Sequence, residues 1–170
     1  MSNLYMVMLG GRHAKANTEV HDVVFAAGES LEDCYPQLRE AWFGEQNGLH
    51  IDAWMKVTAA YTAQDAYQVI LSQEPRTSAL KLWLINLGGY DVREFGELHR
   101  YVLVAAAAEN QAKQLGKAHF ASHWQKQHTD RVLDVDDCIA VDQIAGHFIQ
   151  LRQGPAETEQ WENCYIRIDV

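Results

Sequence analysis

Short apolar runs, separated by turn residues and polar stretches, mark the first half of the chain. Residues 4–9 form a continuous apolar run that ends in two glycines, which is typical of a buried strand. Residues 20–27 are rich in β-branched and aromatic side chains and predict a second strand. Residues 50–57 and 67–71 predict a third and a fourth strand.

Between the second and third predicted strands, the apolar positions change to helical spacing. The positions that recur in this way are Leu31, Tyr35, Leu38 and Trp42. Ser30 suits the N-cap of such a helix. Pro36 conflicts with a helix interior, because proline lacks the amide hydrogen and clashes with the preceding turn. The helix is therefore expected either to be kinked at Pro36 or to begin later.

The second half of the chain repeats this order of elements. Apolar runs predict strands at residues 82–87, 98–105, 128–135 and 147–151. A smoother helical pattern covers residues 109–124, between the second and third of these strands. Each half is therefore predicted to have the order β-β-α-β-β.

Three pairs of motifs separated by the same offset account for this repetition. Each of the following returns 78 residues later: Leu9-Gly10-Gly11 as Leu87-Gly88-Gly89, Glu19-Val20-His21 as Glu97-Leu98-His99, and His50-Ile51-Asp52 as His128-Thr129-Asp130. A constant offset needs no gap, so the sequence predicts a tandem duplication. We assign residues 1–74 to repeat unit one, 81–153 to repeat unit two, and 154–170 to a C-terminal extension with a strand at 164–168.

The order of elements predicts an α+β fold. Strands joined by short connections favour a mainly antiparallel sheet, and one helix per unit covers one face of it. A unit of this size buries too little surface by itself to be very stable. The two units are therefore expected to pack together as one globule with pseudo-twofold symmetry.

The repeated motifs contain ligand-type side chains. Residues at i and i+2 of a strand point to the same face, so each Glu-x-His and His-x-Asp pair shares a face. If the two strands of a unit are neighbours, two imidazoles and two carboxylates converge, a set that suits Zn, Mn or Fe. The candidate residues are Glu19, His21, His50 and Asp52, with Glu97, His99, His128 and Asp130, and the histidines His21, His50, His99 and His128 are the candidate metal ligands.

Three functions remain open for this set, and the catalytic residues, cofactor and ligand are unknown. A structural or binding module is favoured, because each copy must fold and a structural cluster is kept in both copies. The first alternative is a protein that binds a metal or small molecule through the cluster. The second is an enzyme with a single site in repeat unit one, where Arg12, His13 and Asp22 supplement the cluster.

The glycine pairs at the strand ends are predicted to form turns. Gly10, Gly11, Gly88 and Gly89 would each permit a positive φ after a strand. A phosphate-binding role is disfavoured, because neither GxGxxG nor GKS/T accompanies them.

Taken together, an apolar strand that ends in Gly-Gly, a Glu-x-His strand and a His-x-Asp strand after a helix resemble the small family called domain of unknown function 1543. The resemblance covers nearly the whole chain and implies a bacterial protein with two copies of the domain. It implies no activity.

Composition narrows the classes of partner and the location. The net charge is −9 at pH 7, which disfavours nucleic acid and anionic membranes as partners. Self-association is the partner interaction we expect. The three cysteines are widely spaced and form no CxxC motif, which suits reduced thiols. No secretory signal pattern precedes the first strand, so a cytoplasmic location is expected.

Overall fold

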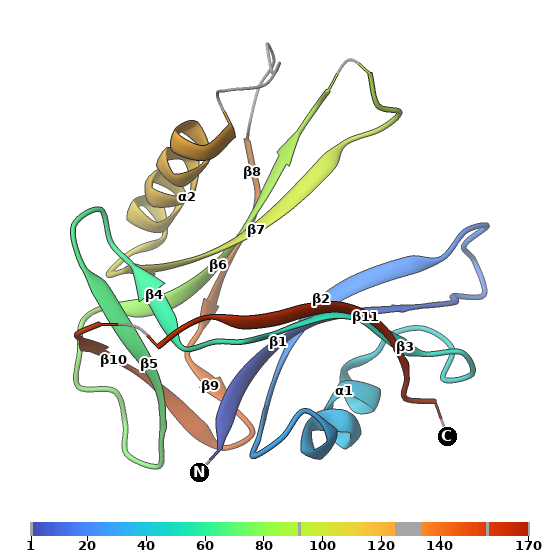
Figure 1. The fold of residues 1–170 in the computed structure, drawn as a ribbon, viewed down its shortest axis with the longest axis horizontal. Coiled ribbons are helices and arrows are strands. Elements are labelled where there is room, and N and C mark those ends of the chain that lie inside the picture. The colour runs from blue at the N-terminus through green and yellow to red at the C-terminus, as the bar shows by residue number, and fades with distance from the viewer. Residues whose placement is uncertain (1, 92, 125–133, 156, 170) are drawn as a thin grey trace. The chain divides into compact units, whose positions relative to one another are not determined.

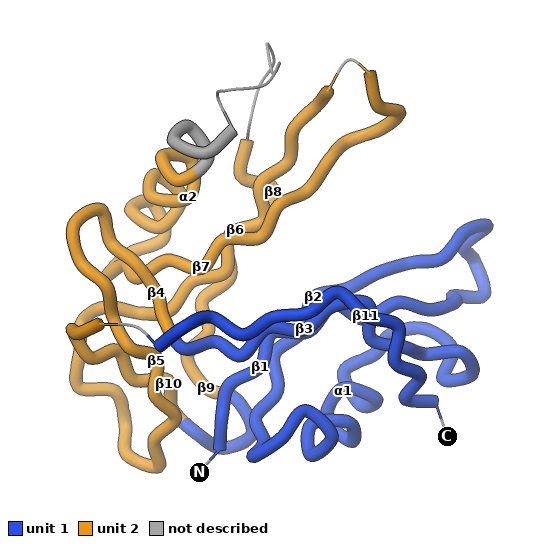
Figure 2. The backbone as a smooth tube through the Cα atoms, viewed as in Figure 1, with its two compact units in different colours: residues 1–58, 144–147, 157–170 blue, residues 59–143, 148–156 orange. Residues whose placement is uncertain are grey.

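The computed structural model describes residues 2–91, 93–124, 134–155 and 157–169, and Figure 1 shows their fold. The chain divides into two compact units, coloured separately in Figure 2. Unit 1 comprises residues 1–58, 144–147 and 157–170, and unit 2 comprises residues 59–143 and 148–156. Residues 59–74, which the sequence places in repeat unit one, therefore belong to unit 2.

Unit 1 is built on a four-stranded antiparallel sheet with the order β11-β3-β1-β2 (Figure 1). Its strands are β1 (Asn3–Gly11), β2 (Val20–Gly28), β3 (His50–Lys56) and β11 (Gln160–Arg167). The first three were predicted by the apolar pattern, and β11 contains most of the predicted C-terminal strand. The central strand β1 thus has β2 on one side and β3 on the other.

The short helix of unit 1 resolves the conflict at Pro36. A single 3₁₀ turn, η1 (Glu32–Cys34), precedes α1 (Tyr35–Ala41), so the proline lies in the first turn of the α-helix. An amide hydrogen has no helical partner there, and the fixed φ of proline suits the position. The predicted helix therefore begins later than the apolar spacing suggests. Its buried residue Leu38 packs into the core of unit 1.

A seven-stranded sheet has the order β8-β6-β7-β4-β5-β10-β9. Its strands are β4 (Ala59–Tyr61), β5 (Ala66–Ser72), β6 (Lys81–Gly89), β7 (Leu98–Ala106), β8 (Asp134–Val141), β9 (Gln143–Ile144) and β10 (His147–Gln153). The short contact between β4 and β7 is parallel, whereas β6 pairs antiparallel with both of its neighbours. The α+β class with mainly antiparallel pairing is confirmed.

The helix α2 (Glu109–Trp124) packs on the sheet of unit 2 and has the predicted bounds. A Cβ atom on Gly116 would lie 2.7 Å from Cγ2 of Ile85, so the glycine permits a close approach of helix to strand. Ile85 and Ala112 are fully buried there, in the same hydrophobic cluster.

The first two strands of each unit pair in the same register. Asn3 pairs with Gly28 in unit 1, and Lys81 pairs with Ala106 in unit 2, so both partners are shifted by the 78 residues found in the sequence. The third strands do not keep this offset. Gly10 pairs with His50, whereas Gly88 pairs with Asp134 and not with His128.

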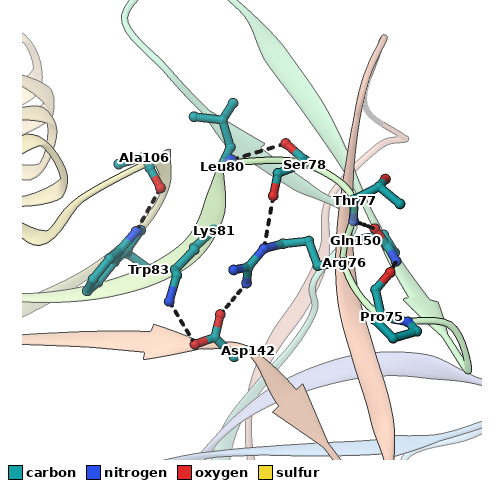
Figure 3. A network of polar contacts seen from close by, with 10 residues as sticks. All are labelled: Pro75, Arg76, Thr77, Ser78, Leu80, Lys81, Trp83, Ala106, Asp142 and Gln150. Atoms are coloured by element: carbon teal, nitrogen blue, oxygen red, sulfur yellow. Dashed lines mark hydrogen bonds and ion pairs between the residues drawn. The ribbon is translucent and has the colours of Figure 1, made fainter.

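Within unit 2, a polar network connects the segment between β5 and β6 to Asp142 and to Gln150 of β10 (Figure 3). Asp142 accepts hydrogen bonds from Arg76 and Lys81, and the side-chain amide of Gln150 donates to the carbonyl groups of Glu74 and Pro75. Burial by itself would raise the pKa of Asp142, but the two cationic partners outweigh burial and lower it. The carboxylate therefore stays ionised.

Candidate metal centre

Four ligand-type side chains gather around Gly10 in unit 1. Gly10 pairs with His21 of β2 on one side and with His50 of β3 on the other. Glu19 immediately precedes β2, and Asp52 lies on β3. The predicted convergence of the Glu-x-His and His-x-Asp motifs therefore occurs in unit 1, across the central strand.

A β-bulge places Asp52 in this cluster. On β1, Met8 pairs with Ala53 and Leu9 pairs with Ile51, so Asp52 has no residue opposite it. A bulge bends its strand and re-aims a side chain, and bulges are common beside functional sites. The sequence pattern of strands does not reveal it.

The bulge continues into the neighbouring strand β11. Asn163 pairs with Ala53 and Ile166 pairs with Ile51, so Cys164 and Tyr165 are the irregular residues. The Tyr165 ring lies against the His50 ring, with centroids 4.3 Å apart and planes tilted by 33°. Burial, with smaller contributions from the charges of Glu162 and Asp52, raises the pKa of Cys164. Its thiol therefore stays protonated beside the cluster.

The four side chains form a closed ring of short contacts between nitrogen and oxygen atoms. Nε2 of His21 lies 3.3 Å from Oε1 of Glu19 and 3.0 Å from Oδ2 of Asp52. Nε2 of His50 lies 3.6 Å from the same Glu19 oxygen and 3.3 Å from Oδ1 of Asp52. Each histidine therefore directs the same ring nitrogen at both carboxylates.

His50 has one ring nitrogen satisfied and the other unsatisfied. Its Nδ1 donates to the carbonyl oxygen of Gly48 at 2.8 Å, which fixes the ring with Nε2 facing the two carboxylates. The His50 side chain is 2 % exposed. Its Nε2 atom and Oδ2 of Asp52 are buried and have no hydrogen-bond partner among the described residues. Buried polar atoms normally have a hydrogen-bond partner or a bound ion, so these two atoms mark a place where a ligand would be favourable.

The spacing of the donors fits a bound metal ion. Zinc lies about 2.0–2.2 Å from histidine nitrogen and carboxylate oxygen. Ligands about 2.1 Å from a shared ion lie roughly 3.4 Å apart in a tetrahedron and roughly 3.0 Å apart at a right angle. The four measured edges of the ring run from 3.0 to 3.6 Å. Ligand atoms of Glu19, His50 and Asp52 all lie within 4.8 Å of one another, so these three residues could share one ion, whereas His21 contacts the two carboxylates from outside this set.

Gly10 forms the floor of this ring. A Cβ atom at Gly10 would lie 2.4 Å from Oδ2 of Asp52 and 2.6 Å from Nε2 of His50. The predicted turn role is wrong for both glycine pairs. Gly10 and Gly11 lie inside β1, and Gly88 and Gly89 lie inside β6. None of these glycines has a positive φ. At Gly10 the lack of a side chain leaves room for the polar cluster instead.

Unit 2 has a related but looser cluster of Glu97, His99 and Asp136. Its two histidine contacts use opposite ring nitrogens, because Nε2 lies 4.0 Å from Glu97 and Nδ1 lies 3.2 Å from Asp136. Nδ1 also faces Oδ1 of Asn86 at 3.3 Å. The His99 side chain is 41 % exposed, so water can satisfy it.

The residue that takes the place of His50 in unit 2 is Asp134. It pairs with Gly88 as His50 pairs with Gly10, and its carboxylate lies 3.0 Å from Nζ of Lys117 on α2. The hydrogen bond from Lys117 lowers the pKa of Asp134. The predicted ligands His128 and Asp130 lie outside the described residues. Asp136, which sequence reasoning missed, is found instead, and an Asp-x-Asp pair with a shifted offset was the available signal.

The residues proposed to supplement a site in repeat unit one have other contacts. Nδ1 of His13 accepts a hydrogen bond from the amide of Lys15, and its ring lies 5.7 Å from that of Phe43. Asp22 follows His21 on β2 and therefore points to the opposite face of the sheet. Its carboxylate accepts a hydrogen bond from the amide of Val23.

Comparison with known proteins supports the resemblance seen in the motifs. Residues 16–71 match the family model described as Domain of Unknown Function (DUF1543), and this segment contains all four cluster residues of unit 1. Over nearly its whole length the chain is similar to the crystal structure of a protein Il1583 from Idiomarina loihiensis. The identity is 25%, the match covers 96% of this chain and 98% of that chain, and the TM-score is 0.68. No curated protein matches.

Among the described residues, no helix is long and apolar enough to cross a membrane.

Proposed function

We propose that this protein binds one divalent transition-metal ion per chain, such as Zn²⁺, through Glu19, His50 and Asp52 of unit 1, with His21 in contact with both carboxylates. The observation that carries the proposal is the buried, unpartnered Nε2 atom of His50, which faces two carboxylates. Its Nδ1 donates to a backbone carbonyl, the arrangement that commonly fixes the ring of a metal-bound histidine.

A protonated His50 accounts less well for this geometry. An imidazolium would carry a hydrogen on Nε2, and burial of that hydrogen without an acceptor in line would be costly. The carboxylate oxygens lie 3.3 and 3.6 Å away without forming a hydrogen bond. A metal ion needs only the lone pair of Nε2, and both oxygens are then its natural neighbours.

The charges of the two carboxylates also support a bound divalent ion. A divalent ion bound between Glu19 and Asp52 would balance the charges of the two carboxylates. Without a cation, Glu19 and Asp52 would place two like charges close to the same ring nitrogens. Zn²⁺ accepts this mixed set of nitrogen and oxygen ligands.

The structural role expected from the sequence is proposed for unit 2 instead. There Asn86 bridges His99 and Asp137, with its side-chain amide donating to Asp137 at 2.9 Å. Asp134 is held by Lys117. These contacts tie β6, β7, β8 and α2 together without an additional ion. We further infer that the units arose by tandem duplication, which the shared register of their first two strands supports.

Metal binding is tested on the full chain after chelator treatment. Titration calorimetry with Zn²⁺ should give one site per chain, and elemental analysis of untagged protein should agree. His50→Ala should weaken binding by roughly 100-fold or more, because it removes the buried ligand. Asp134→Ala removes the corresponding residue of unit 2 and should leave the Zn²⁺ affinity unchanged. No binding, or equal loss in both variants, would refute the proposal.

A further inference from the structure

We infer that the metal ion of unit 1 keeps a coordination position open to solvent, and that this position takes a neutral oxygen donor, a carbonyl or hydroxyl group, from an external molecule. This inference rests on the proposed function, because it assigns the ligand class of the same site. Three observations carry it: the exposure of the donors, their charge, and the position of Tyr165.

Exposure of the donors rises steadily from one side of the ring to the other. The His50 side chain is 2 % exposed, Asp52 is 24 % exposed, Glu19 is 41 % exposed and His21 is 48 % exposed. The backbone of Gly10 closes the ring from below. An ion held there is therefore covered on the side of the sheet and faces water on the other side. Structural zinc sites are closed by four protein ligands, whereas catalytic sites have three and keep a fourth position for water or substrate. Glu19, His50 and Asp52 form a set of three.

The charge of the ligand set selects the kind of group that enters. Glu19 and Asp52 already neutralise a divalent ion, so an incoming anion would give the site a net negative charge. The whole chain carries a net charge of −9, which also opposes the approach of anions. A neutral carbonyl or hydroxyl oxygen brings a lone pair without this cost. Such a group would be polarised by the ion.

Tyr165 lies against the buried ligand His50 and is itself largely exposed. One face of its ring covers His50, at a centroid distance of 4.3 Å. The residue is nevertheless 66 % exposed, so the rest of the ring faces solvent. An aromatic ring that packs on a metal ligand and is free on the other side suits contact with a flat, apolar part of a bound molecule.

The open position is tested with Mn²⁺ as the bound ion, because the relaxation of water protons reports water in its inner coordination sphere. Binding is first established by the electron paramagnetic resonance of free Mn²⁺. The bound ion should relax water protons more strongly than the free ion, because the protein tumbles slowly and water still exchanges. Weaker relaxation than that of free Mn²⁺ would show a closed site and overturn this inference, while the proposed function would stand. If neither Mn²⁺ nor Zn²⁺ binds, the proposed function itself fails.

The class of ligand is tested with a matched pair, benzamide and benzoate, which share a ring and differ in charge. Benzamide should displace the water at a lower concentration than benzoate. Preference for benzoate, or displacement by neither compound, would overturn the inference. Tyr165→Ala should weaken benzamide binding by roughly 2- to 10-fold. Tyr165→Phe should keep it, and the Mn²⁺ affinity of each variant is measured separately. An unchanged benzamide affinity in Tyr165→Ala would remove Tyr165 from the site.

Discussion

The clusters of units 1 and 2 occupy the same place in the same strand arrangement, but their chemistry differs. In each unit a glycine of the central strand lies between a Glu-x-His strand and a strand with a bulged aspartate, which is Asp52 in unit 1 and Asp136 in unit 2. In unit 1 the residue opposite the glycine is His50, which is buried and has no hydrogen-bond partner at Nε2 within the described part of the chain. In unit 2 it is Asp134, which is exposed and paired with a lysine. The residue opposite this glycine is therefore the difference that gives unit 1 a buried nitrogen without a hydrogen-bond partner among the residues that the structure describes.

The comparison also separates two ways of stabilising a polar cluster in a sheet. Unit 2 satisfies its groups with protein partners and water, and Asn86 supplies an amide where unit 1 has Met8. Unit 1 leaves two buried atoms without a protein partner. A fully satisfied polar cluster rigidifies a sheet, whereas buried polar atoms without partners cost folding free energy.

The largest effect is expected from Gly10→Ala. The added methyl group would lie within 2.6 Å of Nε2 of His50 and closer still to Asp52, so it would displace both ligands. The Zn²⁺ affinity should fall by roughly 100-fold or more, and overpacking should cost about 1–3 kcal/mol of folding stability. Calorimetric titration and urea unfolding measure the two effects.

Gly88→Ala is the matched control, since its methyl group would crowd Asp136 and Glu97 at 2.2 and 2.6 Å. It should reduce stability and leave the Zn²⁺ affinity intact. Equal affinity losses in the two variants would contradict a metal site confined to unit 1.

A second prediction tests the comparison by placing in unit 2 a histidine that corresponds to His50 of unit 1. Asp134→His places an imidazole opposite Gly88, beside Glu97, His99 and Asp136. The protein should then bind two Zn²⁺ ions per chain, the second about 10-fold or more weakly. Among the described strands β8 lies at the edge of its sheet, so no neighbour covers it as β11 covers β3 in unit 1. Asp134→Asn serves as control and should bind one ion. A single ion in both variants would mean that the residue opposite the glycine does not decide binding.

A third, smaller effect concerns the stability of unit 2. The folded-state pKa of Asp142 lies below its ordinary value of 3.8, because Arg76 and Lys81 outweigh burial. The carboxylate therefore contributes stability that is present above the unfolded-state pKa and is lost as the pH falls through the folded-state value. Asp142→Asn should cost about 0.5–1 kcal/mol at pH 7, a modest value because the side chain is 46 % exposed.

The measurement is urea unfolding of Asp142→Asn and the wild type at several pH values. The difference between the two proteins should shrink as the pH falls from 5 to 2. A difference that grows toward low pH would have the wrong sign for a lowered pKa. Zn²⁺ binding by unit 1 should be unaffected at pH 7.

The smallest effect is expected in thiol chemistry. Burial, with Asp33 and Glu32 nearby, raises the pKa of Cys34 to about 11 and also shields the thiol. Iodoacetamide at pH 8 should therefore modify Cys138, which is only partly buried, well before Cys34. Mass spectrometry of timed samples gives both rates. If Cys34 reacts as fast as Cys138, unit 1 opens more readily than its packed core suggests.

Much of the fold followed from local patterns. The helix of residues 109–124 and the strands around both glycine pairs were predicted because each combines a clear period with clear breakers. The strands β4 and β9 were missed because two or three residues are too few to show a period. The placement of residues 59–74 in unit 2 depends on pairing between distant strands, which local patterns do not encode.

The sequence predicted the residues that gather in unit 1, whereas its predictions His128 and Asp130 for unit 2 lie outside the described residues. The repeated motifs pointed to Glu19, His21, His50 and Asp52, and these four residues lie in contact in the structure. In unit 2 the same offset led to His128, although the strand that pairs with β6 begins at Asp134. The longer helix α2 ends at Trp124, whereas α1 ends at Ala41, so the strand that follows also begins later. Only the pairing with Gly88 shows which residue faces the cluster.

The cover of His50 comes from a strand far away in the sequence. Cys164 contacts the carbonyl oxygen of Ile51 across 113 residues, and Tyr165 lies beside it in the same bulge. During synthesis the ribosome makes the four residues of the cluster long before it makes β11. Tyr165 can therefore cover the His50 ring only after β11 docks onto β3. Metal loading before and after that docking would take place in two different environments.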